Sequence, residues 1–414
     1  MTTIDLFDPQ TQECPYEAYA SLRDDSPVYR VPDTNMYVVT RYADIVDISR
    51  RTAEFAQGPA SGEALIKDEE ALEIYRRDGI ARPPRVPLSS DPPIHRHYRS
   101  MVDGFFSARG AERQRPLITK VTNSVIDTWI DKGDIEYVTE FAKPLPVHII
   151  TVMMGFPEEA IPDLVRWSDA WVMPFSGNLT PEQERYVAEQ GVEWQRAILK
   201  TIEEKRRNPD DTVLSHLGNA DFVDVDGTRR RLTDQELVYM VDQVHTGGNE
   251  TTTFAMTSAL WLMLTTPGVE DRLRADRSLI PRFVDECLRL ESPTQGMFRH
   301  TTREVELHGV TIPAGATVHL RFAAANRDER TFPDPSVIDL GRRNGNRHVA
   351  FGQGEHHCVG AGLSRLEQQI ALDVLLTRLD DLRLLDTNDY RHKPGFVLRA
   401  LKQLRVGFSK AATP

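Results

Sequence analysis

Cys358 is the residue of this chain best suited to bind a metal, and it lies in the glycine-rich stretch VAFGQGEHHCVGAG, residues 349–362. Glycines let backbone N–H groups approach one sulfur closely, and a helix predicted to begin after Gly360 adds positive partial charge. Both effects favour the thiolate, which is the form that binds metals. A zinc site needs paired cysteines that are missing here, whereas a single thiolate is sufficient as the axial ligand of a haem iron.

Two other interpretations of Cys358 are weaker. Most intracellular cysteines are buried and structural, but that role does not require a histidine and several glycines at fixed positions around the sulfur. A metal cluster of His356, His357 and Cys358 would need three consecutive side chains to face one ion, which would distort the backbone severely. The sequence therefore favours a single thiolate ligand.

A second polar cluster lies in the middle of a long predicted helix. Thr233 and Glu236 form a capping box, and the helical pattern runs to Thr266, just before a proline. The centre of this helix, HTGGNETTT at residues 245–253, combines adjacent glycines with hydroxyl and amide side chains, all unfavourable in a buried helix. A run of residues that disfavour a helix, placed inside an otherwise strongly predicted helix, indicates a functional site. The alternative is a Gly–Gly packing contact with Glu250 in a surface ion pair.

Two further helical motifs carry charged side chains. The stretch DPPIHRHYR at residues 91–99 begins a helix and places His95 and Arg99 on one face, either for an anionic ligand or as a solvated basic surface. Glu286 and Arg289 share one face of a helix that is otherwise apolar and ends near a proline. We expect the second pair to be buried, where breaking it would be costly.

Taken together, these motifs resemble those of the cytochrome P450 family, in the family's order. The pattern FGxGxHxCxG at residues 351–360 resembles the family's haem-binding loop, HTGGNET its oxygen-activating helix, DPPxHxxxR its C helix and ExxR its structural brace. The resemblance is to soluble, bacterial-type members and spans residues 91–360, while the N-terminus and residues 110–207 match in plan only. Gly247 departs from the pattern, because the family usually has alanine there.

The resemblance implies a role for each motif residue. The metal ligand would be Cys358, which would bind the iron of haem b. The catalytic pair that supplies protons for the activation of O2 would be Glu250 and Thr251. The remaining cofactor-binding residues would be His95, Arg99, Arg299 and His356 at the haem propionates, with Phe351, Gly352 and Gly360 in the cysteine loop.

Two further sets follow from the same resemblance. The structural network would consist of Glu286, Arg289 and Arg342. The substrate pocket would include Val244, His245, Gly247, Gly248, Gln295, Met297 and Phe396.

The fold that the resemblance implies is mainly α with a smaller β-rich region (α+β), a triangular prism formed by residues 1–414 as a single module. The β-rich part would lie mainly in residues 26–60, 299–322 and 381–408, and the helical part mainly in residues 91–292 and 359–380. Local patterns predict two β segments in residues 26–41, a short helix around residues 69–77, and a β-hairpin across residues 303–322 that turns at Pro313.

Composition excludes several classes of protein. The net charge of −12 argues against a nucleic-acid partner, and three cysteines provide no disulfide framework. No apolar run approaches the roughly 18 residues of a membrane span, and the first residues form no signal peptide. We therefore expect a cytoplasmic protein without a membrane anchor.

The resemblance implies a haem-thiolate monooxygenase that hydroxylates, or O- or N-demethylates, a hydrophobic small molecule with O2. The chain has no flavin or iron–sulfur motif, so electrons from NAD(P)H would arrive through a ferredoxin and its NAD(P)H-dependent reductase. The arginines expected to face this ferredoxin are Arg96, Arg109, Arg113 and Arg343. The alternatives are a peroxide-driven haem-thiolate enzyme, against which Glu250 and Thr251 argue, and a non-catalytic haem or small-molecule binding protein.

Overall fold

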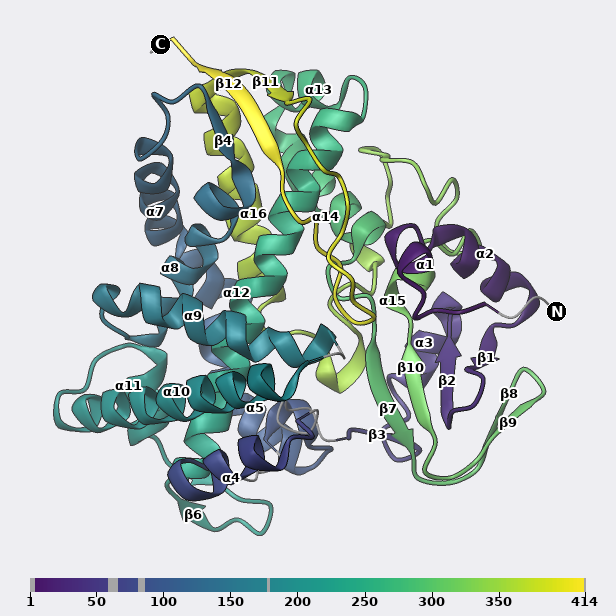
Figure 1. The fold of residues 1–414 in the computed structure, drawn as a ribbon, viewed down its shortest axis with the longest axis vertical. Helices are drawn as coiled ribbons and strands as arrows, with labels where there is room; N and C mark the ends of the chain where they lie inside the picture. Colours follow the sequence, from purple (N-terminus) through teal and green to yellow (C-terminus); the bar gives the residue numbers. More distant parts are fainter. Residues whose placement is uncertain (1–3, 59–65, 81–85, 177–178, 413–414) are drawn as a thin grey trace. The chain divides into compact units, whose positions relative to one another are not determined.

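The computed structural model describes residues 4–58, 66–80, 86–176 and 179–412 of the chain (Figure 1). The chain folds into two compact units. Unit 1 comprises Met1–Ala56, Glu112–Leu145 and Thr251–Pro414, and unit 2 comprises Gln57–Ala111 and Pro146–Glu250. The prediction of a single module stays a prediction, and each unit is described by itself below.

A five-stranded sheet forms the β-rich part of unit 1. The strands follow the order β1 (Val28–Arg30), β2 (Met36–Val39), β10 (Thr317–Leu320), β7 (Met297–Thr301) and β3 (Phe55–Ala56). Only β2 and β10 run parallel, and all other neighbours are antiparallel. The two β segments predicted in residues 26–41 are confirmed as β1 and β2.

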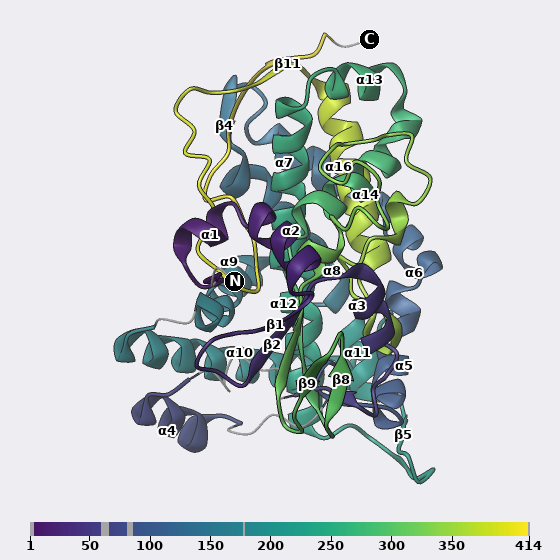
Figure 2. The ribbon, with the colours of Figure 1, turned by 90° about the vertical axis from the view of Figure 1, so that its right-hand side faces the viewer.

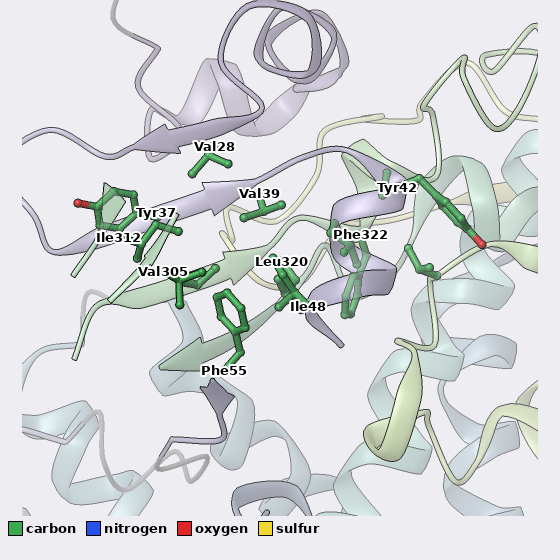
Figure 3. Packing of buried hydrophobic residues seen from close by; sticks show 14 of the residues in the cluster. Val28, Tyr37, Val39, Tyr42, Ile48, Phe55, Val305, Ile312, Leu320 and Phe322 are labelled. Atoms are coloured by element: carbon green, nitrogen blue, oxygen red, sulfur yellow. The ribbon is translucent and has the colours of Figure 1, made fainter. Parts of the chain in front are cut away.

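Apolar side chains from this sheet and from nearby helices gather in one cluster (Figure 3). Val39 and Leu320 come from the central strands, Ile48 from α3 (Tyr42–Ile48) and Phe322 from α15 (Phe322–Ala325). Burying such side chains contributes roughly 1.5–3 kcal/mol each. The cluster therefore supports the strand β7, which carries the candidate residue Arg299.

The hairpin prediction for residues 303–322 was wrong in its pairing. The hairpin consists of β8 (Val305–Leu307) and β9 (Val310–Ile312) around His308–Gly309, and β10 pairs instead with β7 and β2. Positive φ angles at His308 (50°) and Gly309 (73°) make this two-residue turn. Pro313 only connects β9 to β10. The alternating pattern correctly indicates strands, but alternation does not specify a strand's partner.

Helices of unit 1 surround the cysteine region. The helix α16 (Ala361–Arg378) packs against α14 (Ile280–Glu291) and α7 (Arg115–Asp127), as Figure 2 shows. A three-stranded sheet of β11 (Leu379–Leu384), β12 (Arg405–Lys410) and β4 (Asp134–Glu136) follows α16. The other helices of unit 1 are α1 (Pro9–Glu13), α2 (Tyr16–Asp25) and α13 (Val269–Ala275).

Unit 2 is mainly helical. The helix α4 (Glu69–Asp78), predicted around residues 69–77 and confirmed, packs along α10 (Pro181–Arg207), which also contacts α9 (Ile161–Val172) and α11 (Val213–Asn219). Further elements of this unit are α5 (Ile94–Phe106), α6 (Ala108–Arg113), α8 (Pro144–Met154) and the short strands β5 (Phe222–Val223) and β6 (Arg229–Arg230). By residue number, α6 and α8 each extend into unit 1.

The predicted long helix is confirmed as α12 (Asp234–Thr265), a continuous helix of 32 residues. The predicted capping box is present, because the Glu236 amide donates to Thr233 Oγ1 at 3.2 Å and the Thr233 amide donates to Glu236 Oε2 at 2.8 Å. Tyr98 of α5 and Arg230 of β6 also donate to this carboxylate, at 2.5 Å and 2.7 Å. These bonds fix where α12 begins. In the described part of the chain, no helix has the length and apolar character needed to cross a membrane.

Candidate active site

Cys358 lies at an exposed position directly before α16, in a loop that is tightly fixed. Its amide donates to the Phe351 carbonyl at 2.9 Å. Gly352 and Gly354 adopt φ angles of 70° and 72°, a region that favours glycine. A Cβ on Gly354 would lie 2.4 Å from the Ser49 carbonyl oxygen, so only glycine allows this approach. The loop therefore presents a thiol at the N-terminus of a long helix, where the thiolate is stabilised.

Three side chains that were not predicted from the sequence anchor this loop: Arg365, Asp285 and His348. The Arg365 guanidinium of α16 lies 4.6 Å from the Phe351 ring centroid, and its Nε donates to Asp285 of α14 at 2.7 Å. His348 Nε2 lies 3.4 Å from the same carboxylate oxygen. Arg365 follows Cys358 by two helical turns, which is a usable signal, but nothing in the sequence pairs it with an aspartate 80 residues earlier.

The four predicted propionate contacts fall in both units. In unit 1, Arg299 of β7 is buried and donates to the Phe298 carbonyl at 2.7 Å, while His356 is half-buried in the 3₁₀ turn Gly354–His356. In unit 2, His95 is buried on α5, and Arg99 one turn later donates to Asp103 at 2.6 Å. Their contact with haem propionates stays a prediction.

The middle of α12 carries the predicted catalytic pair. Glu250 is 5% exposed, and its Oε1 accepts a long hydrogen bond of 3.5 Å from Ser168 of α9. Asn249 also donates to Ser168 Oγ, at 3.0 Å. Thr251 follows Glu250 directly and is half-buried. The structure thus adds one hydroxyl, Ser168, to the polar side chains around Glu250 in unit 2.

Within unit 1, Thr252 connects α12 to α16, the helix that follows Cys358. The hydroxyl groups of Thr252 and Ser364 are 3.1 Å apart, and Ser364 lies on α16 six residues after Cys358. This bond fixes the position of Thr252 relative to α16. Sequence reasoning had no basis for pairing these two hydroxyls.

The two adjacent glycines have different surroundings. A Cβ on Gly247 would meet no atom within 4 Å, whereas one on Gly248 would lie 3.4 Å from Ile150 of α8. Gly248 therefore lets α8 and α12 approach each other, and Gly247 leaves open space beside the helix. The helix continues through both residues without a break.

The predicted pocket residues also divide between the units. In unit 2, Val244 is half-buried and His245 is buried with its ring 5.0 Å from that of Trp194; burial lowers the pKa of His245 to about 4. In unit 1, Gln295 uses its side-chain amide to donate to the Glu291 and Ser292 carbonyls, at 2.9 Å and 2.7 Å.

The other two pocket candidates of unit 1 are packed against apolar or cationic neighbours. Met297 packs against the cluster of Figure 3. Phe396 stacks on Phe7 at 4.7 Å and lies 4.0 Å below the Arg321 guanidinium. A pocket role for these residues stays a prediction.

The ExxR residues form a buried ionic network. Arg289 donates to both oxygens of Glu286, at 2.7 Å and 2.9 Å, and also to the carbonyls of the loop after α15. Arg342 Nε lies 3.1 Å from the same carboxylate. Glu286 is 1% exposed and Arg289 0%. The network ties the loop before Cys358 to α14.

The donor set fits a haem better than an ion bound by protein alone. Among the described residues, no group of three or more histidine, cysteine, aspartate or glutamate side chains could hold a metal. An exposed thiol at a helix N-terminus can bind iron only if other ligands come from outside the chain, as porphyrin nitrogens do. A mainly helical protein with such a thiol and a polar break in its longest helix belongs to the haem-thiolate class.

Comparisons with known proteins identify the family. The family model for Cytochrome P450 matches residues 85–403. Cytochrome P450 107B1 of Saccharopolyspora erythraea is 34% identical over 411 residues, which cover 97% of this chain and 96% of that protein. Vitamin D(3) 25-hydroxylase of Pseudonocardia autotrophica is 33% identical over 410 residues, which cover 97% and 96%. The structure of cytochrome P450 CYP109Q5 from Chondromyces apiculatus superposes with a TM-score of 0.84 at 30% identity and covers 99% of both chains.

The chain belongs to the cytochrome P450 family. Its cofactor is therefore haem b and its activity is that of a monooxygenase. The mainly α fold with smaller sheets, expected from the sequence, is confirmed by the structural neighbours. The roles of individual residues are not tested by these comparisons and are proposed below.

Proposed function

We propose that this enzyme hydroxylates or demethylates a hydrophobic small molecule, with Cys358 as the iron ligand and electrons delivered from NAD(P)H by a ferredoxin and its reductase. The observation that carries the proposal is the exposed Cys358 thiol at the N-terminus of α16, in a loop fixed by glycines and by the Phe351 carbonyl. When bound, the haem supplies the oxygen chemistry. The protein supplies the ligand, the protons and the binding of the substrate.

The thiolate form of Cys358 is favoured by its position. The helix dipole of α16 and the backbone amides near its start stabilise a negative charge on the sulfur. A Cβ on Gly360, the N-cap of α16, would lie 3.9 Å from Sγ, an ordinary van der Waals contact. A thiolate ligand donates electron density that favours cleavage of an O–O bond.

Protons are handled by residues of α12 and α9. Glu250 holds or releases a proton at its carboxyl group, and the Ser168 hydroxyl donates to Oε1 when that group is ionised. Thr251, the next residue on α12, offers a hydroxyl that can accept one proton and donate another. The open space beside Gly247 leaves room for a water molecule in the same stretch. This supply of protons favours an O2-dependent reaction over one driven by peroxide.

The apolar nature of the substrate is supported by the pocket candidates, most of which lack charge. One relative is named for the hydroxylation of vitamin D(3), a hydrophobic molecule. Hydrophobic ligands bind in concave sites that a few polar groups orient.

The first experiment is the absorption spectrum of the reduced, carbon-monoxide-bound holoenzyme and of Cys358→Ala. We expect a strongly red-shifted Soret band in the wild type and its loss in the variant, because only a thiolate ligand produces that shift. Cys14→Ala serves as a control, since Cys14 is also exposed but lies on neither α12 nor α16. A band that survives in Cys358→Ala would refute the assignment of the ligand.

A further inference from the structure

Unit 2 contains a cavity whose lining includes three tryptophans, two tyrosines and one acidic residue, Asp242. The cavity lies among α4, α9, α10 and the first part of α12, and offers about 40 Å³ to the centres of water-sized groups. Its principal lining residues are Tyr75, Trp167, Trp171, Trp194, Tyr239 and Asp242.

The carboxyl group of Asp242 is buried and accepts hydrogen bonds from two neutral donors. It is 8% exposed, and its two oxygens accept hydrogen bonds from Trp171 Nε1 at 2.7 Å and from Trp194 Nε1 at 3.0 Å. Among the described residues, no lysine, arginine or histidine shifts the pKa of Asp242 by its charge. Burial raises the pKa of Asp242 to about 6, and the two indole hydrogen bonds oppose that rise. The carboxyl group therefore ionises below neutral pH, and within the described part of the chain it has no cationic partner.

A buried carboxylate without a cation is costly, because neutral donors replace only part of its hydration. A structural bridge between two indoles needs acceptor atoms but no net charge. Each carboxylate oxygen also keeps a lone pair after accepting one indole hydrogen bond. Asp242 lines the cavity and therefore brings to it acceptor capacity that the two indoles do not use.

The aromatic walls are suited to a positive charge. The Trp167 and Trp194 rings lie 5.1 Å apart at 32°, and the negative faces of such rings attract cations. Trp167 already has the Arg166 guanidinium 5.6 Å from its ring. A Cβ at residue 191 would lie 2.2 Å from the Tyr75 hydroxyl, so Gly191 allows Tyr75 to approach α10 this closely.

We propose that this cavity binds an organic ammonium group, with Asp242 as its counter-ion and the indoles of Trp167, Trp171 and Trp194 as its walls. Quaternary and other alkylammonium groups are the ligands that such cages of aromatic rings recognise. The site would select a molecule that carries one cationic amine on an otherwise apolar frame.

The cavity can bind an ammonium group whatever the reaction of the enzyme. The further inference that the bound molecule is a substrate rests on the proposed monooxygenase function. Along α12, Asp242 precedes Glu250 by eight residues, about 12 Å at 1.5 Å per residue. A substrate anchored at Asp242 by its amine would need an apolar body of about that length to reach the level of Glu250.

Isothermal titration calorimetry on the holoenzyme tests the inference with choline and its neutral isostere 3,3-dimethylbutan-1-ol. We expect choline to bind the wild type at least ten times more tightly than the alcohol. Asp242→Asn removes the charge and also one of the two indole hydrogen bonds, because an amide nitrogen cannot accept from an indole N–H. We expect it to weaken choline at least tenfold, and unchanged binding of the alcohol shows that the cavity itself survives the loss of that bond. Asp169→Asn, which removes an exposed charge from the same α9 helix that carries Trp167, should leave both affinities within twofold.

Equal binding of choline and the alcohol by the wild type would overturn the inference, and so would unchanged choline binding by Asp242→Asn. The wild-type comparison needs no variant, so it decides the matter even if Asp242→Asn does not fold. The carbon-monoxide spectrum of the same sample separates the two proposals. A red-shifted band with no preference for choline rejects the ammonium site alone, and a preference without the band rejects the thiolate assignment alone.

Discussion

At the scale of single residues, the chemistry depends on a few side chains whose neighbours set their properties. Cys358 lies just before the N-terminus of α16, a position that favours the proposed thiolate, and Glu250 lies within 3.5 Å of the Ser168 hydroxyl of α9. Burial raises the pKa of Asp242 to about 6, and hydrogen bonds from two indoles oppose that rise. In each case the residue type is ordinary and its surroundings set its chemistry.

Replacing Thr251 with alanine should uncouple electron use from product formation. The hydroxyl that passes protons would be lost, so NAD(P)H consumption should continue while product yield falls about tenfold or more and hydrogen peroxide is released. Measurement requires a ligand that shifts the haem spin state, reconstituted with a ferredoxin and its reductase. Thr265→Ala, at an exposed site of the same helix, should leave coupling unchanged. Wild-type coupling in Thr251→Ala would contradict the proton role.

The buried carboxyl of Glu367 on α16 should make stability depend on pH. Burial raises its pKa to about 8, and within the described structure its Oε2 atom has no hydrogen-bond partner. The folded state therefore keeps this proton at a pH where the unfolded chain, with a pKa near 4.5, has lost it. The free energy of unfolding should fall as pH rises from about 5 to about 8, by up to about 1.4 kcal/mol per pH unit from this group.

Glu367→Gln cannot ionise and should lose that component of the pH dependence. Denaturant unfolding of the wild type and the variant between pH 5 and pH 8 measures the difference between their slopes. Parallel curves for the two proteins would show that the group does not titrate in this range.

At the scale of elements, glycines decide how closely backbones approach. Gly354 lets the cysteine loop touch the end of α3, and Gly248 lets α8 approach α12. Gly247 has no such contact, so its small size matters for the space beside α12 rather than for packing. Glycine is therefore needed for close packing at Gly354 and Gly248, whereas at Gly247 it leaves open space beside α12.

Alanine substitutions at Gly247 and Gly354 should distinguish a glycine beside open space from a glycine that packing requires. Gly247→Ala restores the residue that the family usually has and should stabilise the protein by about 0.5–1 kcal/mol, because alanine suits a helix better and its Cβ meets nothing within 4 Å. Gly354→Ala should destabilise it by at least about 2 kcal/mol, since its φ is positive and its Cβ would collide with the Ser49 carbonyl. Thermal unfolding of the holoenzymes compares them. Destabilisation by Gly247→Ala would indicate that the space is filled.

At the scale of the whole molecule, the family relationship covers nearly the entire chain, as coverage of 97–99% in the comparisons named above shows. The net charge is −12, so a basic surface such as the one proposed to face a ferredoxin must be local. Arg109 and Arg113, exposed and one turn apart on α6, are candidates for such a surface. Electrostatic attraction of this kind acts mainly on the rate of association and weakens with salt.

Charge reversal at both arginines should slow reduction by a ferredoxin. We expect Arg109→Glu with Arg113→Glu to lower the second-order rate at low salt by about tenfold and to reduce its dependence on ionic strength. Arg272→Glu, an exposed change on α13, serves as the control. Stopped-flow reduction under carbon monoxide measures the rates. Rates equal to those of the wild type at every ionic strength would place the docking surface elsewhere.

The sequence by itself determined the family, the cofactor and the long helix, because these depend on short motifs whose spacing is local. The loop around Cys358, the capping box of α12 and the polar break at residues 245–253 are each contained within a few turns of chain. Local hydrogen bonding and periodicity act over such distances, so they can be read directly from residue types.

Only the tertiary structure decided which distant residues meet. It paired β10 with β7 rather than with β9, joined Thr252 to Ser364, placed Arg365 against Phe351, and brought Trp171 and Trp194 to Asp242. These contacts depend on packing between elements far apart in sequence, which no local pattern encodes. The aromatic cavity follows from them, because Asp242 alone is an ordinary acid on a helix and acquires a role only from the indoles that surround it.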